Sequence, residues 1–171
     1  MQIDEIVDVY GGGINLESIN RVNEEKIGFI ADYNFMKSEN YYYLLDNNTI
    51  IGALTGEKIN HCNKKLFVIY GVTVIPNYRG MVLGSQMYNY IMHYTGCNLM
   101  SDNEHSGDGR KLWRTIARTH NVKVLDLLTC DVVSSNIDDA YNNKHSLVLI
   151  TLNKLNKGSP LIPTFRKGEV K

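Results

Sequence analysis

The chain has little of what would place it in a specialised class of protein. Its 171 residues include three cysteines and three prolines, and 18 basic residues balance 18 acidic ones. A formal charge of zero excludes a global field that would draw the protein onto nucleic acid or an anionic membrane. No apolar run approaches the roughly 20 residues that a membrane-spanning helix needs. We therefore expect a single cytoplasmic domain with no membrane partner.

The cysteines give no sign of a disulfide framework or a metal site. Cys62, Cys97 and Cys130 are odd in number and far apart. Such usage is typical of reduced, mostly buried thiols in a cytosolic protein. His61 stands beside Cys62, but a tetrahedral metal site needs further ligands at suitable spacing. We interpret His61 and Cys62 as surface loop residues and expect no metal.

The strongest local pattern is an apolar strand that runs into a turn and a helix. Residues 65–75 are mostly β-branched or aromatic, which favours a strand buried on both faces, and Pro76 ends it. The segment 79–84, RGMVLG, then opens a helix that ends near Gly96. The N–H groups of a first helical turn attract anions, and glycines let an anion approach the backbone. With the charge of Arg79 added, this turn predicts a phosphate site.

Hydrophobic periodicity predicts the remaining elements, which together make a mixed sheet covered by helices. This α/β domain spans residues 1–155, and a C-terminal extension follows at 156–171. The other expected elements are a strand at 3–9, a helix with Leu16, Ile19 and Val22, a helix with Ile27, Ile30, Tyr33 and Met36 on one face, a hairpin of Tyr41–Leu45 and Thr49–Lys58, a strand at 98–102, a helix at 106–119, and strands at 122–130 and 146–153.

Two motifs resemble those of the GNAT superfamily of acyl-CoA-dependent N-acyltransferases. Residues 48–54, NTIIGAL, are similar to the family's hairpin, and residues 74–80, VIPNYRG, match the way its central strand often closes. The resemblance covers about residues 40–155, and it extends to short GNAT-like proteins encoded by bacteriophages. It implies a mixed, mostly antiparallel sheet of six to seven strands with helices on both faces. It also implies acetyl-CoA as co-substrate.

The resemblance further implies which residues contact acetyl-CoA. Arg79 and Gly84 match the family's pyrophosphate loop, but Val82 stands where its first glycine belongs and narrows the approach to the backbone. Trp113 occupies the position of the tyrosine that often protonates the leaving thiolate. The thioester is expected between strands 65–75 and 98–102, which should part at their C-terminal ends. The implied cofactor-binding residues are Val72, Thr73, Val74, Arg79, Gly80, Met81, Val82, Leu83, Gly84, Ser85, Ser106 and Trp113.

The acceptor amine needs a base, because an amine with a pKa near 10.4 is almost wholly protonated at pH 7. Residues 66–75 contain no carboxylate and no histidine. We favour Asp102, acting directly or through a water, with His105 second. Asp102 is interpreted equally well as a cap of the following helix. Tyr141 is a candidate replacement acid, or else a tyrosine of a solvated loop.

Three functions therefore compete. The first is an N-acetyltransferase, monomeric or homodimeric, that acts on a small-molecule or peptide amine. The second is a GNAT-shaped binding protein, suggested by Val82 and Trp113. The third is a phage-type enzyme that modifies DNA bases, with phosphates held by one basic helix face. That face carries Arg110, Lys111, Arg114 and Arg118. Zero net charge makes nucleic acid the less favoured partner.

Overall fold

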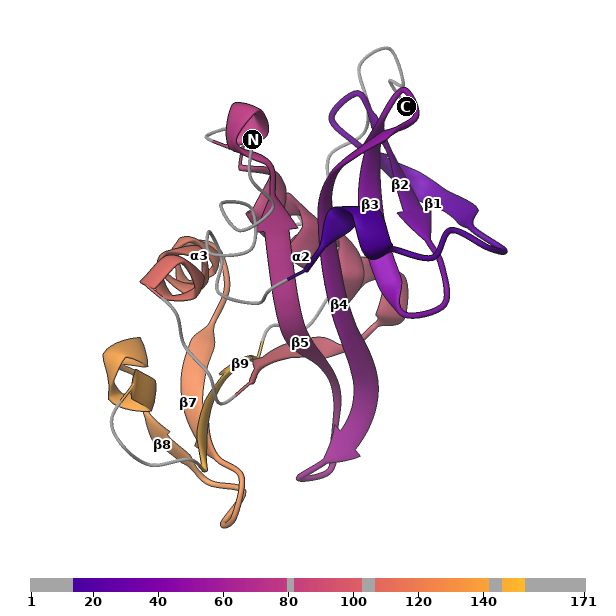
Figure 1. Cartoon of the computed structure of the whole chain (residues 1–171). Helices are drawn as coiled ribbons and strands as arrows, with labels where there is room; N and C mark the ends of the chain where they lie inside the picture. The colour runs from indigo at the N-terminus through magenta and orange to yellow at the C-terminus, as the bar shows by residue number, and fades with distance from the viewer. Residues whose placement is uncertain (1–13, 80–81, 103–106, 142–145, 153–171) are drawn as a thin grey trace, which may run out of the picture.

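The computed structural model describes residues 14–79, 82–102, 107–141 and 146–152 (Figure 1). Within these ranges nine strands form one sheet in the order β1-β2-β3-β4-β5-β6-β9-β7-β8. All neighbouring strands are antiparallel except β5 and β6. The α/β class and the mostly antiparallel sheet are confirmed, but the sheet is wider than the expected six to seven strands. The elements are β1 (Glu25–Ile30), β2 (Tyr33–Lys37), β3 (Tyr41–Asp46), β4 (Thr49–His61), β5 (Lys64–Val74), α2 (Leu83–Thr95), β6 (Asn98–Ser101), α3 (Gly107–Ala117), β7 (Val122–Asp126), β8 (Val132–Ser134) and β9 (Leu147–Thr151).

The sheet is wider partly because a hairpin replaces an expected helix. Ile27, Ile30, Tyr33 and Met36 lie in β1 and β2, so the helical interpretation is wrong. Ile30 and Tyr33 are partners across a two-residue turn, so their spacing of three reflects a chain reversal. Ala31 in this turn has a φ of 53°, the left-handed conformation that tight hairpins use. Periodicity alone cannot separate the two structures in so short a segment.

The first expected helix is reduced to the 3-10 helix Leu16–Ser18. Ile19 is buried, but Val22 is 65% exposed, so the apolar stripe does not continue. A helix without a continuous buried stripe gains little from packing. The expected strand at 3–9 and the extension at 156–171 lie outside the described residues.

Both α-helices pack into one cluster of buried side chains on one face of the sheet. Leu83, Met87 and Ile91 of α2 meet Phe67 of β5 there, and Trp113 of α3 belongs to the same cluster. The 3-10 helix packs on the other face, against β2, β3 and β4. Burial of each large apolar side chain contributes about 1.5–3 kcal/mol, so these clusters hold the sheet that carries the site. In the described part of the chain, no helix is long and apolar enough to cross a membrane.

Most of the other predicted elements are confirmed. The hairpin of Tyr41–Leu45 and Thr49–Lys58 forms β3 and β4, with Asn47 at a φ of 56° in its turn. β5, α2, β6, α3 and β9 also lie close to their expected ranges. The strand expected at 122–130 is wrong at its end, because β7 is shorter and a turn follows it. β8 and a 3-10 helix, Ile137–Tyr141, then form where no regular structure was predicted.

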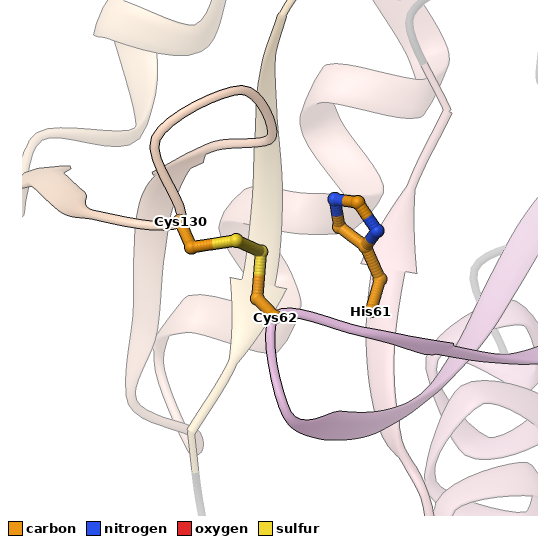
Figure 2. A group of neighbouring side chains, drawn as sticks. All are labelled: His61, Cys62 and Cys130. Carbon is orange, nitrogen blue, oxygen red and sulfur yellow. A yellow bond between two sulfur atoms is a disulfide. The ribbon is translucent and has the colours of Figure 1, made fainter.

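The cysteines correct another expectation. Cys62 and Cys130 form a disulfide across a sequence separation of 68 (Figure 2). Cys97 is buried and free. The expectation of three reduced thiols therefore does not hold in this structure. The fold brings the tip of the β4–β5 hairpin to the turn after β7, and sequence spacing does not reveal such a long-range approach.

Candidate active site

The parallel strands β5 and β6 stop pairing at the edge where the sequence places the site. Their register runs from Leu66 and Asn98 to Ile69 and Ser101. β6 then ends, whereas β5 continues to Val74 and stays paired with β4. Beyond Ile69, the β6 side of β5 has no strand partner among the described residues. Main-chain groups at this end of β5 are therefore not used by a ladder to β6.

α2 begins shortly after the end of β5. The 3-10 helix Pro76–Tyr78 follows the strand, and Arg79 Nε donates to Val74 O at 3.0 Å. This bond holds the guanidinium against the strand end. The helix that follows has 13 residues, so its N-terminus carries the partial positive charge of a full helix dipole. Gly80 and Met81, which link Arg79 to this helix, lie outside the described residues.

Val82 is the N-cap residue of α2 and has an unusual backbone conformation. Its φ of 53° and ψ of 27° are left-handed, and its side chain makes no capping hydrogen bond. Its carbonyl accepts from Gln86 N at 3.1 Å and from Ser85 Oγ at 3.0 Å. A left-handed conformation is strained for a β-branched residue and relaxed for glycine. The turn thus has the backbone that glycine would adopt, with a valine side chain that is 57% exposed.

Several predicted cofactor residues turn their side chains into the core. Thr73 is fully buried. It pairs with Ala53 of β4 on the face of the sheet opposite α2. A Cβ on Gly84 would meet the methyl carbons of Leu112 at 3.4 Å, an ordinary contact. Contact between these residues and a ligand would therefore use the main chain. The residues buried on the α2 side are Val72, Val74, Leu83 and Trp113.

Several polar side chains lie near the point where β5 and β6 stop pairing. Tyr70 sits at a bulge of β5, is 44% exposed and donates to Glu57 Oε1 at 2.5 Å. Asp102 directly follows β6. The hydrogen bond to Glu57, burial, and the negative charges of Glu57 and Asp102 raise the pKa of Tyr70 to about 12. Near the end of β6, a neutral phenol is thus bonded to one carboxylate and lies within the field of a second.

Comparison with known proteins settles the family. The profile of the acetyltransferase (GNAT) family matches residues 14–104, more than half of the chain. The chain belongs to the GNAT acetyltransferase family. This membership supports acyl-CoA-dependent acyl transfer in general. No curated protein sequence gave a match.

Three solved structures resemble the chain at low identity. The Bacillus subtilis N-acetyltransferase YlbP, in complex with coenzyme A, is 13% identical over 65% of this chain and 66% of that one, with a TM-score of 0.45. Arabidopsis thaliana Naa50, in complex with the bisubstrate analogue CoA-Ac-MVNAL, is 11% identical over 66% and 72%, with a TM-score of 0.41. A protein assigned to the GNAT family from Bacteroides thetaiotaomicron is 10% identical over 90% and 80%, with a TM-score of 0.42. The chain thus spans about two thirds of the length of YlbP.

Trp113 and Val82 depart from the GNAT motifs quoted above. Trp113 is 4% exposed and makes an edge-to-face contact with Tyr88, with ring centroids 5.7 Å apart. The indole therefore packs between α2 and α3. His105, the second candidate for the base, and Ser106, an implied cofactor contact, lie outside the described residues. Of the departures, Val82 is the one at the predicted phosphate site.

Tyr141 is docked on α3 instead of lying in a solvated loop. The Arg110 guanidinium lies over its ring, 4.3 Å from the centroid. Burial raises the pKa of Tyr141 to about 12, against the smaller opposing effect of Arg110 and Arg114. Arg114 also bonds Asp138 at 3.2 Å. Arg110 and Arg114 of α3 thus hold the 3-10 helix Ile137–Tyr141 against α3.

Sequence reasoning missed Glu57, because it lies on β4 and reaches Tyr70 only through the bulge of β5. One signal was available in the neighbouring Gly56. A Cβ there would lie 2.1 Å from Val68 O, so only glycine fits. An isolated glycine inside a strand pattern indicates a bulge or a close backbone approach. Such a reading would have placed Glu57 next to a distortion of the sheet.

Proposed function

We propose that this GNAT protein is an N-acetyltransferase that moves the acetyl group of acetyl-CoA to a primary amine by direct attack. The observation that supports this most is that β5 continues beyond the end of β6, unpaired on that side among the described residues, toward Arg79 and the N-terminus of α2. A thioester can bind along main-chain groups that no neighbouring strand uses, and its diphosphate needs positive charge. The unpaired side of β5 beyond Ile69, together with Arg79 and the N-terminus of α2, supplies both within one short stretch of this chain.

In this proposal the cofactor binds mainly to backbone. The first-turn N–H groups of α2, from Leu83 to Ser85, together with Gly80, Met81 and Arg79, take the diphosphate. The thioester carbonyl accepts from a main-chain N–H near Val72 or Thr73. This assignment agrees with the burial of both side chains. Ser106 is proposed to contact the same cofactor.

The acceptor is proposed to enter beside Asp102. Asp102 removes a proton from the ammonium group, and the free amine then attacks the thioester carbon. The new C–N bond forms as the C–S bond breaks, and CoA leaves as a thiolate. Tyr70 and Glu57 would fix the local field around this carboxylate. His105 is the second candidate for the base.

The leaving thiolate is proposed to take the second proton of the attacking nitrogen, which becomes strongly acidic once the new C–N bond forms. A phenol whose pKa is about 12 is a weaker acid than a thiol, whose ordinary pKa is about 8.5. Proton transfer from Tyr141 to the thiolate would therefore be uphill. This argument disfavours Tyr141 as the acid. Its proposed role is to pack the 3-10 helix that it ends against α3.

Turnover of acetyl-CoA with a panel of small-molecule and peptide amines tests this function. Asp102→Asn should lower kcat about 10²–10⁴-fold at pH 7, the usual contribution of a general base. The deficit should shrink as the pH rises toward the pKa of the amine, because the free amine then needs no base. A residue that only caps a helix would lower stability without changing the pH profile. Glu39→Gln, an exposed carboxylate elsewhere, is the matched control.

A binding protein without acetyl transfer is the second candidate. The left-handed valine at position 82 and the indole at position 113 favour it, because both depart from the GNAT motifs. This candidate predicts that acetyl-CoA binds but is not consumed with any amine. Release of free CoA in an amine-dependent manner would exclude it.

A further inference from the structure

A cluster of metal-ligating side chains lies far along the sheet from the proposed acetyl-transfer site. His61 and Cys62 stand at the tip of the β4–β5 hairpin, and Cys130 ends the turn after β7. One potential ligand atom from each of the three lies within 4.8 Å of the others. Figure 2 shows the imidazole of His61 beside the disulfide. In the described part of the chain, these three residues form the group that could hold a metal.

The imidazole is already held against the turn that carries Cys130. His61 Nε2 lies at hydrogen-bond distance, 3.0 Å, from Leu127 O. The same turn is closed by Cys130 N, which donates to Asp126 O at 2.8 Å. His61 and the turn that carries Cys130 are therefore held by backbone contacts and not by the disulfide alone. A site held in this way would persist when the disulfide is reduced.

The backbone at both cysteines suggests that their side chains have a role. Cys62 has a φ of 54° and Cys130 a φ of 62°. Glycine and asparagine are the usual residues in this left-handed region, which costs other residues roughly 1–2 kcal/mol each. Asn63, next in the hairpin turn, has a φ of 57°. Cysteine is a poor choice for these two turns unless its sulfur is used.

We propose that reduction of the Cys62–Cys130 disulfide converts this group into a zinc site. Two thiolates and an imidazole are ligands that zinc prefers, at about 2.3 Å for sulfur and 2.0–2.1 Å for nitrogen. Tetrahedral geometry then places ligand atoms roughly 3.3–3.8 Å apart, which the 4.8 Å limit of the cluster accommodates. A water completes the fourth position.

The two states are linked by a balanced reaction. The disulfide takes up two electrons from a thiol or phosphine reductant and two protons, from that thiol or from water, and becomes two thiols; a phosphine takes the oxygen of the water and becomes the phosphine oxide. Zinc then displaces the two thiol protons and binds both thiolates and the imidazole. The metal and the disulfide exclude one another, because the same sulfur atoms form both.

Both the disulfide and the zinc site would link the β4–β5 hairpin to the turn after β7. β6 and β9 share the single register pair Met100 and Ile150, so the seam between the two halves of the sheet is narrow. Cys62 packs against the buried cluster that crosses this seam, which includes Leu66 and Val148. Zinc would therefore preserve, under reducing conditions, the cross-link that the disulfide provides under oxidising ones.

The test compares the oxidised and reduced full-length protein. A phosphine reduces the disulfide anaerobically and becomes the phosphine oxide, and it is then removed. Zinc is titrated in competition with a chromophoric chelator, and cobalt(II) reports thiolate ligation by its charge-transfer absorption. The reduced protein should bind one zinc ion per chain, and the oxidised protein should bind at least about 100-fold more weakly. This comparison needs no variant.

Variants then identify the ligands. Cys62→Ser and Cys130→Ser should each weaken zinc binding at least about 100-fold, and His61→Ala at least about 10-fold, since each removes one of three ligands. Cys97→Ser, which removes the buried free thiol, should bind as the wild type does. The proposal is overturned if the reduced wild type binds no zinc, if either serine variant or His61→Ala keeps full affinity, or if binding depends on Cys97. None of these outcomes depends on acetyl transfer.

Discussion

Val82 offers a direct test of how the predicted phosphate turn is built. It begins α2 in a left-handed conformation and is 57% exposed. We consider two replacements, Val82→Gly and Val82→Ala. Both remove the branched side chain, so the packing contacts that they lose are nearly the same. The two variants differ in how readily the residue adopts a left-handed backbone. Their comparison therefore isolates this conformational effect.

The expected difference in stability between the two variants follows from the backbone conformation at position 82. A left-handed conformation costs an L-residue roughly 1–2 kcal/mol, and glycine avoids this cost. Glycine loses about 0.5–1 kcal/mol more conformational entropy on folding than alanine does. The difference leaves Val82→Gly more stable than Val82→Ala by about 0.5–1 kcal/mol. For a chain of this size, that corresponds to a melting temperature about 1–4 °C higher.

Scanning calorimetry or urea unfolding with an unchanged m-value measures the difference. Lys111, exposed in the middle of α3, is the matched control. At that position alanine should be more stable than glycine by about 0.8–1.0 kcal/mol, the ordinary helical order. An alanine variant at position 82 as stable as the glycine variant, or more stable, would refute the left-handed turn. Val82→Gly should also bind acetyl-CoA at least as tightly as the wild type, because it widens the approach to the backbone.

Two further predictions concern stability. Gly56→Ala should lower the free energy of unfolding by about 2–4 kcal/mol in urea titrations, because its Cβ would lie 2.1 Å from Val68 O. Gly84→Ala should change it by less than about 1 kcal/mol, and similar losses in both variants would contradict the geometry. Folding raises the pKa of four tyrosines to about 12. The free energy of unfolding should therefore fall as the pH rises from about 10 to 12, because the unfolded chain releases its phenolic protons first. Urea midpoints that stay constant over this pH range would contradict this prediction. The tyrosines concerned are Tyr42, Tyr43, Tyr70 and Tyr141.

Local signals made part of the fold predictable. The strand at 65–75 and the helix after Arg79 follow from an unbroken apolar run, a proline and an amphipathic stripe, and all of these are short-range features. The β1–β2 hairpin failed because Ile30 and Tyr33 face each other across a turn at a spacing that a helix also produces. β8 has three residues, too few to show any period.

The candidate site was predictable to a similar extent. Arg79 and the start of α2 belong to one continuous motif, so the sequence places them together. Glu57 enters the site through a bulge, which depends on how two strands pair. Cys62 and Cys130 meet through the closure of the whole sheet, and no pattern along the chain encodes that approach.

Calorimetric titration of the protein with acetyl-CoA tests the central claim most directly. We expect binding of one acetyl-CoA per chain, and Arg79→Glu should weaken it about 10–100-fold, since a charge-assisted bond of about 1.5–3 kcal/mol is lost. Lys26→Glu, the same change of charge on the edge strand β1, should bind as the wild type does. No heat with acetyl-CoA, or equal affinity in Arg79→Glu with an unchanged melting temperature, would contradict the account.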